Sequence, residues 1–249
     1  MTSTMETSAV DRDTPPLAVN DLQKRFAGIK AVNGVSLTVG RSEVVGVIGP
    51  NGSGKSTLFN LIAGAFQPDS GSVRLAGTDV TRWPAWRVAR AGLGRTFQIP
   101  SLFNNITVWD NLLAAAVEGD WRGAPARAEA ALELLQIGHV RDNLASELSG
   151  GQQKLVEFGR VYMRDPTVVL LDEVTAGVHP NIRRIILTAV QHLQETGTTF
   201  LVIEHDMELV REVCDRIVVM DFGEVVASGS FEEISGNADV RQAYLGRQT

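Results

Sequence analysis

Cysteine is almost absent from this 249-residue sequence, which contains only Cys214. A single cysteine cannot form an internal disulfide or a site with several cysteine ligands, and we expect it to be a small core residue. Clusters of basic residues are also missing: 23 Lys and Arg against 29 Asp and Glu give a formal net charge of -6. Proteins that bind nucleic acid usually concentrate positive charge on one face, so we expect no DNA or RNA partner.

Long apolar runs are missing as well. No stretch approaches the roughly 20 apolar residues that span a bilayer, and the opening MTSTMETSAVDRDTPP has neither a basic end nor an apolar run. We therefore expect the chain to stay in the cytoplasm. Residues 1–16 are expected to be a disordered tail, because they bury too little apolar surface to order. Residues 17–249, in a sequence that is 44% hydrophobic, are enough for one domain, with or without an attached lobe.

The spacing of apolar residues divides the rest of the chain into strands and helices. Short β-branched runs bounded by turns predict strands at 17–22, 35–39, 44–48, 72–75, 168–171, 199–203 and 216–220. Apolar residues three to four positions apart predict helices at 108–117, 128–135, 152–163, 181–194 and 207–213. Strands that alternate with helices indicate an α/β fold with a mainly parallel sheet, and the helical signals between the two groups of strands indicate a helical insert.

The strongest chemical signal is GPNGSGKST at residues 49–57, which follows an apolar strand and opens an apolar helix. Glycines in such a loop let backbone N–H groups point at phosphate oxygens, and the following helix presents its partly positive N-terminus. This is a complete Walker A motif, so we predict that the chain binds ATP with Mg²⁺. Lys55 should reach the β and γ phosphates, Ser56 should bind Mg²⁺, and Thr57 should bond a phosphate oxygen. The predicted ATP contacts of the loop are Gly49, Pro50, Asn51, Gly52, Ser53, Gly54, Lys55, Ser56 and Thr57.

A second signal is the apolar run VVLL at residues 168–171, which ends in Asp172 and Glu173. Carboxylates at the end of a strand are often only solvated, but with the loop upstream this pattern resembles a Walker B strand. Asp172 is then expected to hold Mg²⁺, directly or through water. Glu173 is expected to act on the attacking water as a general base.

A third motif, LSGGQ at residues 148–152, follows a loop and opens a helix. Ser149 with two glycines can be an ordinary helix cap, but it can equally be a second anion site at a helix N-terminus. Between a Walker A and a Walker B motif, it resembles the signature of ATP-binding-cassette (ABC) ATPases, and the resemblance covers residues 17–246. It implies a P-loop NTPase core with helices on both faces of the sheet, an antiparallel β subdomain, and a helical signature-motif subdomain at about residues 91–165.

The resemblance also assigns roles to three residues outside these motifs. Phe26 matches the aromatic that stacks on adenine, although it can also be read as a core residue. Gln98 in RTFQIP matches the glutamine that touches Mg²⁺ or the attacking water, and His205 matches the histidine that contacts the γ phosphate. The implied metal ligands are Ser56, Gln98 and Asp172, and the implied catalytic residues are Lys55, Gln98, Glu173 and His205.

The family's mechanism implies a partner for every site. Two ATPase subunits, identical or paralogous, are expected to pair head to tail, so that Ser149, Gly150, Gly151 and Gln152 of one chain contact the ATP of the other. The pair is expected to lie on the cytoplasmic face of the membrane, against transmembrane permease subunits that a periplasmic or extracellular solute-binding protein supplies. Soluble cassette ATPases that act outside transport, and modules that hold ATP without turnover, are the alternatives.

The sequences of two longer segments indicate a particular group within this family. GLGRTFQIPSLFNNITVWDNLLAA and IEHDMELVREVCDRIVVMDFGEVVASG are similar to the ATPases of branched-chain amino-acid importers, and the ATPases of urea, amide and lipid transporters share much of this wording. Three residues depart from the usual pattern. Val174 replaces a proline and should loosen the turn after Glu173, His179 stands where Asp is frequent, and Lys154 replaces Arg with little expected consequence.

Overall fold

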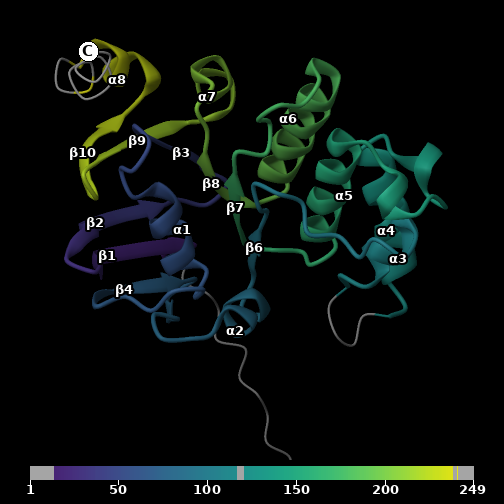
Figure 1. Cartoon of the computed structure of the whole chain (residues 1–249), viewed down its shortest axis with the longest axis horizontal. Helices are drawn as coiled ribbons and strands as arrows, with labels where there is room; N and C mark the ends of the chain where they lie inside the picture. Colours follow the sequence, from purple (N-terminus) through teal and green to yellow (C-terminus); the bar gives the residue numbers. More distant parts are fainter. Residues whose placement is uncertain (1–13, 117–120, 238–239, 241–249) are drawn as a thin grey trace, which may run out of the picture.

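The computed structural model describes residues 14–116, 121–237 and 240. Two sheets organise these residues (Figure 1): a four-stranded sheet of order β2-β1-β4-β5 and a six-stranded sheet of order β10-β9-β3-β8-β7-β6. Every pairing in the first sheet is antiparallel. In the second, all pairings are parallel except that of β9 with β10. The predicted α/β fold, with a mainly parallel core sheet and an antiparallel subdomain, is confirmed.

All seven predicted strands form. The antiparallel sheet contains β1 (Leu17–Phe26), β2 (Ile29–Val39), β4 (Ser70–Leu75) and β5 (Thr78–Asp79). The other sheet contains β3 (Val44–Ile48), β6 (Leu93–Arg95), β7 (Val168–Asp172), β8 (Thr199–Ile203), β9 (Arg216–Asp221) and β10 (Glu224–Gly229). The three strands that were not predicted, β5, β6 and β10, all lie at sheet edges. An edge strand needs no continuous apolar run, so its sequence signal is weak.

The predicted helices also form, with shifted ends. They are α1 (Lys55–Ile62), α3 (Val108–Leu113), α4 (Ala124–Leu134), α5 (Gly150–Tyr162), α6 (Pro180–Glu195) and α7 (Met207–Val213). Two short helices, α2 (Ala85–Arg90) and α8 (Phe231–Gly236), were not predicted. Two short 3-10 turns, Gly138–Val140 and Ala145–Glu147, precede α5. Helix α3 ends at Leu113, before the predicted end at residue 117, which lies outside the described residues.

The core lies on both faces of the six-stranded sheet. Alternate residues of its central strands pack in opposite directions: Val45 and Leu170 pack with α1 and the antiparallel sheet, whereas Val44 and Val169 pack with α3, α4, α5 and α6. Figure 1 shows the same arrangement, with β3, β8 and β7 running between α1 on one side and α5 and α6 on the other. Burial on both faces explains why these strands are continuously apolar in sequence.

Two predicted boundaries need correction. The helical range 91–165 is too long at its start, because Leu93–Arg95 pair in parallel with β7 as part of the core sheet. The predicted tail, residues 1–16, lies outside the described residues up to residue 13. Its last residue, Pro16, is buried, and its carbonyl accepts a hydrogen bond from the amide of Ala76 at 2.8 Å. Pro16 therefore packs with the domain and does not belong to a disordered tail.

None of the helices in the part of the chain that the structure describes has the length and apolar character that a bilayer-spanning segment needs.

Cys214 is half-buried and packs against both the α5–α6 side of the core and the cluster around α7 and β9. Burial raises the pKa of its thiol to about 12. The thiol therefore stays protonated and unreactive, as expected for a core residue.

Candidate functional site

The loop between β3 and α1 is built for close backbone contact. Gly54 has φ 101° at the N-cap of α1, and a Cβ there would lie 2.2 Å from the carbonyl oxygen of Ala31. A Cβ on Gly49, which has φ 153°, would lie 2.1 Å from the carbonyl oxygen of Met220. Only glycine fits these two positions. No side chain among the described residues caps the first amides of α1, so these N–H groups are available to an anion.

The side chain of Lys55 binds backbone atoms of its own loop. Its buried Nζ donates to the carbonyl oxygens of Gly49 at 2.8 Å and Pro50 at 3.0 Å. Burial lowers the pKa of Lys55, while the charges of Glu173 and Asp172 oppose that shift. The ammonium group therefore lies in a poorly hydrated place that is electrostatically coupled to both carboxylates at the end of β7. A phosphate group would provide the anionic partner that such a buried cation needs.

Asp172 ends β7 as a buried carboxylate. Its Oδ2 lies 3.4 Å from Nη2 of Arg95, and its amide donates to Oγ1 of Thr96 at 3.3 Å. Burial raises the pKa of Asp172, although the charge of Arg95 opposes this shift. Arg95, whose Nη1 also donates to Oδ1 of Asn60 at 2.8 Å, was not singled out from the sequence. Its contact with Asp172, which lies 77 residues later in the sequence, could not be predicted from the residues around Arg95.

Glu173, Gln98 and His205 meet in space. Oε1 of Glu173 lies 2.8 Å from Nε2 of His205, and Oε2 accepts a hydrogen bond from Nε2 of Gln98 at 2.9 Å. The backbone of Glu173 is left-handed, with φ 49°, and its amide donates to the carbonyl of Ile203 at 3.0 Å. A left-handed glutamate is strained and must be held by its surroundings.

Several contacts hold the turn that follows Glu173. Oε1 of Glu204 accepts hydrogen bonds from the amide of Thr175 at 3.2 Å and from its hydroxyl at 3.0 Å. Glu204 is buried, and this burial raises the pKa of its carboxyl group. Val174 is also buried, within the apolar core. The looser turn expected from the missing proline stays a prediction, but the turn has side-chain supports that the sequence analysis did not identify.

The signature segment lies apart from the loop of the same chain. Ser149 caps α5 in a reciprocal arrangement: its hydroxyl accepts from the amide of Gln152 at 3.4 Å, and Oε1 of Gln152 accepts from the amide of Ser149 at 2.9 Å. Ser149 and Gly150 are exposed. In Figure 1, α5 and α1 lie on opposite sides of the six-stranded sheet. The exposed N-terminus of α5 therefore faces outward, where another molecule can reach it.

Phe26, Ser56 and His179 are exposed at the surface. Phe26, at the end of β1, is 42% exposed, and its ring packs edge-on against Phe66 at 5.5 Å between centroids. Ser56 is exposed in the first turn of α1. His179 caps α6 on the surface, where its Nδ1 accepts from the amide of Asn181 at 3.2 Å. An exposed aromatic at a strand end suits stacking on a base better than a place in the core.

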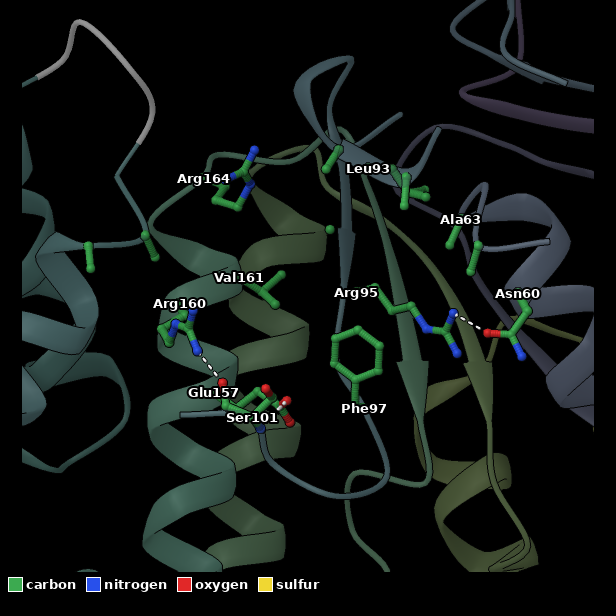
Figure 2. A pocket seen from close by; sticks show the side chains of 16 residues that line it. Asn60, Ala63, Leu93, Arg95, Phe97, Ser101, Glu157, Arg160, Val161 and Arg164 are labelled. Carbon is green, nitrogen blue, oxygen red and sulfur yellow. Dashed lines mark hydrogen bonds between the residues drawn. The ribbon is translucent and has the colours of Figure 1, made fainter. Parts of the chain in front are cut away.

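A groove of about 400 Å³ runs between α1 and α2 on one wall and α5 on the other (Figure 2). Small residues such as Ala63 and Ala89 line it, and Arg95, Arg160 and Arg164 give it positive charge. Among the described residues that line it, the one carboxylate is Glu157 of α5, whose Oε1 accepts a hydrogen bond from the amide of Ser101 at 3.3 Å. Neither the groove nor Glu157 was predicted from the sequence, because both arise where the lobe meets the core.

Burial raises the pKa of Glu157 from its ordinary value of 4.5 to about 7, although backbone hydrogen bonds and nearby cations oppose the shift. The folded chain therefore binds more protons than the unfolded chain between these two pH values, and stability should fall as pH rises from about 4.5 to 7. Glu157→Gln keeps an acceptor oxygen but removes the titration. We expect the variant to gain roughly 1–3 kcal/mol relative to the parent at pH 8 compared with pH 5.

Urea unfolding of the parent and Glu157→Gln at both pH values measures this difference. Glu133→Gln, an exposed carboxylate on α4, is the matched control and should show the same offset from the parent at each pH. A constant offset for Glu157→Gln as well would contradict a raised pKa at this position.

Comparison with known proteins places these features in a family. The family described as "ABC transporter" matches residues 32–176, and the family "Branched-chain amino acid ATP-binding cassette transporter" matches residues 224–248. A crystal structure of a nucleotide-free ATP-binding cassette from an ABC transporter superposes with a TM-score of 0.82 at 35% identity, covering 92% of this chain and 98% of that one.

This chain matches two relatives over almost their entire length. The probable branched-chain amino acid transport ATP-binding protein LivG of Archaeoglobus fulgidus is 38% identical, over 93% of this chain and 96% of the relative. The lipopolysaccharide export system ATP-binding protein LptB of Escherichia coli K12 is 36% identical, over 92% and 97%. Relatives named for the transport of different molecules are therefore similar to this chain over almost its whole length.

Proposed function

Because this chain belongs to the ABC transporter family of ATP-binding ATPases, we propose that it powers an importer of branched-chain amino acids through separate transmembrane subunits. The observation that carries the catalytic part is the meeting of Gln98 and His205 on the carboxylate of Glu173. The substrate is supported by the family match at residues 224–248 and by the name of the Archaeoglobus fulgidus relative.

In the proposed reaction, Glu173 takes the proton of the attacking water. One carboxylate oxygen faces Nε2 of His205 and the other accepts from Gln98, so the base is oriented from both sides. Lys55, which donates to carbonyl oxygens of its own loop, turns to the β and γ phosphates and neutralises charge there. Ser56, Gln98 and Asp172 offer the oxygen ligands that suit Mg²⁺, which would neutralise phosphate charge when bound.

Each site needs a second ATPase subunit. Helix α5, which Ser149 caps, lies on the other side of the six-stranded sheet from α1, and Ser149 and Gly150 at its N-terminus are exposed. We infer that residues 149–152 contact the γ phosphate of ATP held by a partner, which is a second copy or a paralogue. Phe26 stacks on the adenine of the chain's own ATP.

The groove between α2 and α5 is the proposed docking place of a permease subunit. It is lined by small side chains and arginines, which suits a partner helix with small apolar residues and a carboxylate. Docking there would hold the chain on the cytoplasmic face of the membrane. A solute-binding protein on the other side would act on the permease without touching this chain.

Uptake by cells tests the proposal. In a strain that lacks this chain, uptake of labelled leucine, isoleucine and valine should fall to background, the parental chain should restore it, and Glu173→Gln should not. Urea uptake is the parallel control and should be unaffected. Loss of urea uptake alone would assign the chain to a urea transporter, and a lipid export defect with normal leucine uptake would assign it to the role named for the Escherichia coli relative.

A further inference from the structure

Helix α5 carries three charged side chains, Lys154, Glu157 and Arg160, at successive spacings of three residues. Residues three apart on a helix are neighbours on its surface, so these form one continuous stripe, here called the α5 charged stripe. All three reach backbone atoms of two loops: the loop that follows β6 and carries Gln98, and the turn that follows β7 and begins at Glu173.

Lys154 holds the turn at Glu173. Its Nζ donates to the carbonyl oxygen of Ala176 at 2.7 Å and to that of Glu173 at 3.3 Å. The carbonyl direction of Glu173 follows from its left-handed backbone, which is otherwise unfavourable. Burial lowers the pKa of Lys154, while the charges of Glu204, Glu157 and Glu173 oppose the shift. A cation in this place stabilises the particular turn that aims the Glu173 carboxylate.

Glu157 and Arg160 hold the loop around Gln98. The carboxylate of Glu157 accepts a hydrogen bond from the amide of Ser101, three residues after Gln98, at 3.3 Å. Nη1 of Arg160 donates to the carbonyl of Ser101, and its guanidinium lies 5.0 Å from the ring centroid of Phe103. Figure 2 shows Glu157, Arg160 and Ser101 meeting at the base of the groove, with Phe97 nearby. The loop is therefore tied to α5 by both donors and acceptors.

The two loops held by this helix supply the two partners of one bond, Nε2 of Gln98 to Oε2 of Glu173 at 2.9 Å. We propose that the α5 charged stripe positions Gln98 and Glu173 for hydrolysis, so that Lys154, Glu157 and Arg160 are positioning residues. The inference rests on the proposed function, in which Glu173 is the base. Ser149, the residue inferred to contact ATP in the opposite site, is the N-cap of helix α5. One rigid element thus links the nucleotide of one site to the base of the other.

Steady-state hydrolysis by the full chain, assembled with its membrane subunits, tests the role of Lys154. Lys154→Met should lower kcat by about tenfold to a hundredfold, because a misaimed base loses rate, while KM for ATP stays within about twofold. Lys154→Arg should recover most of the loss, since a guanidinium can donate to the same two carbonyls. Gln153→Met is the matched control: Gln153 is also half-buried on α5, but its Nε2 bonds only the carbonyls of Ala145 and Leu148, at 3.4 and 3.3 Å.

Arg160→Met tests the second loop and serves if Lys154→Met does not fold. It should lower kcat in the parent but cause no further loss in a Gln98→Ala background, because its effect passes through Gln98. The positioning role of the α5 charged stripe would be wrong if Lys154→Met and Arg160→Met both kept the parental kcat. It would also be wrong if Arg160→Met lost equal activity in the parent and in Gln98→Ala. In both cases Glu173→Gln would remain inactive. If Glu173→Gln hydrolysed ATP like the parent, the proposed base itself would be wrong, and the stripe would fall with it.

Discussion

Glu173→Gln is expected to lower kcat for ATP hydrolysis by about 10²–10⁴-fold while ATP binding is retained. The glutamine has the same size and can still meet His205 and Gln98, which lie 2.8 and 2.9 Å from the two carboxylate oxygens. An amide cannot accept the proton of the attacking water, so the chemical step fails although the geometry survives. Trapped ATP should then hold two subunits together, and the closed pair should be visible by gel filtration.

Hydrolysis and ATP binding by Glu173→Gln should be compared with those of Glu208→Gln. Glu208 is an exposed carboxylate in the first turn of α7, close in sequence to His205 but outside the site. That control should behave like the parent in both assays. Parental turnover by Glu173→Gln would show that another group activates water, and Glu204, buried beside Thr175, would become the next residue to test.

The parts of the site that could be predicted are those encoded within one short segment. The loop at residues 49–57 is preceded by a strand and followed by a helix, and its glycines, lysine and hydroxyls report one local geometry. Asp172 and Glu173 directly end a buried strand, and Ser149 directly opens a helix. In each case the functional residue lies next to the end of a helix or strand in the sequence. Its role can therefore be predicted without knowledge of the fold.

The supports of the site could not be predicted, because their partners are distant in sequence. Arg95 meets Asp172 across 77 residues, and Gln98 meets Glu173 across 75. Lys154 in place of Arg was expected to have little consequence because the charge is kept, and its contacts could not be predicted. Only the packing of α5 against the sheet turns it toward the carbonyls of Glu173 and Ala176. The same holds for Glu157, which is polar in sequence but buried in the fold.

The strained conformation of Glu173 was invisible in sequence for a further reason. Proline at position 174 is usual in the family, and its absence suggested a turn with fewer restraints. The structure supplies restraints from outside the turn instead: the carbonyl of Ile203, the carboxylate of Glu204 and the ammonium of Lys154. A turn can be made rigid by local covalent geometry, such as that of proline, or by tertiary hydrogen bonds. Only the local covalent geometry can be predicted from the sequence of the turn itself.

Gly54→Ala should destabilise the chain strongly and weaken ATP binding. At φ 101°, the alanine would adopt a left-handed backbone and place its Cβ 2.2 Å from the carbonyl oxygen of Ala31, which belongs to β2 and cannot rotate away as a side chain can. We expect a loss of roughly 3 kcal/mol or more in the free energy of unfolding. If the chain shifts to relieve the clash, the first amides of α1 move with it, and ATP affinity should fall at least about tenfold.

Gly197→Ala separates backbone strain from the clash. Gly197 has φ 110°, close to that of Gly54, but a Cβ there would meet nothing within 4 Å, and the residue follows α6 away from the loop. Its replacement should cost only about 1–2 kcal/mol and leave ATP binding unchanged. Urea unfolding and equilibrium ATP binding of the two variants measure both quantities. Equal losses of stability would mean that strain alone sets the cost, and that the approach of β2 does not require glycine at the start of α1. A larger loss for Gly54→Ala, accompanied by weakened ATP binding, would tie the glycine to the contact that fixes the phosphate-binding end of α1 against the antiparallel sheet.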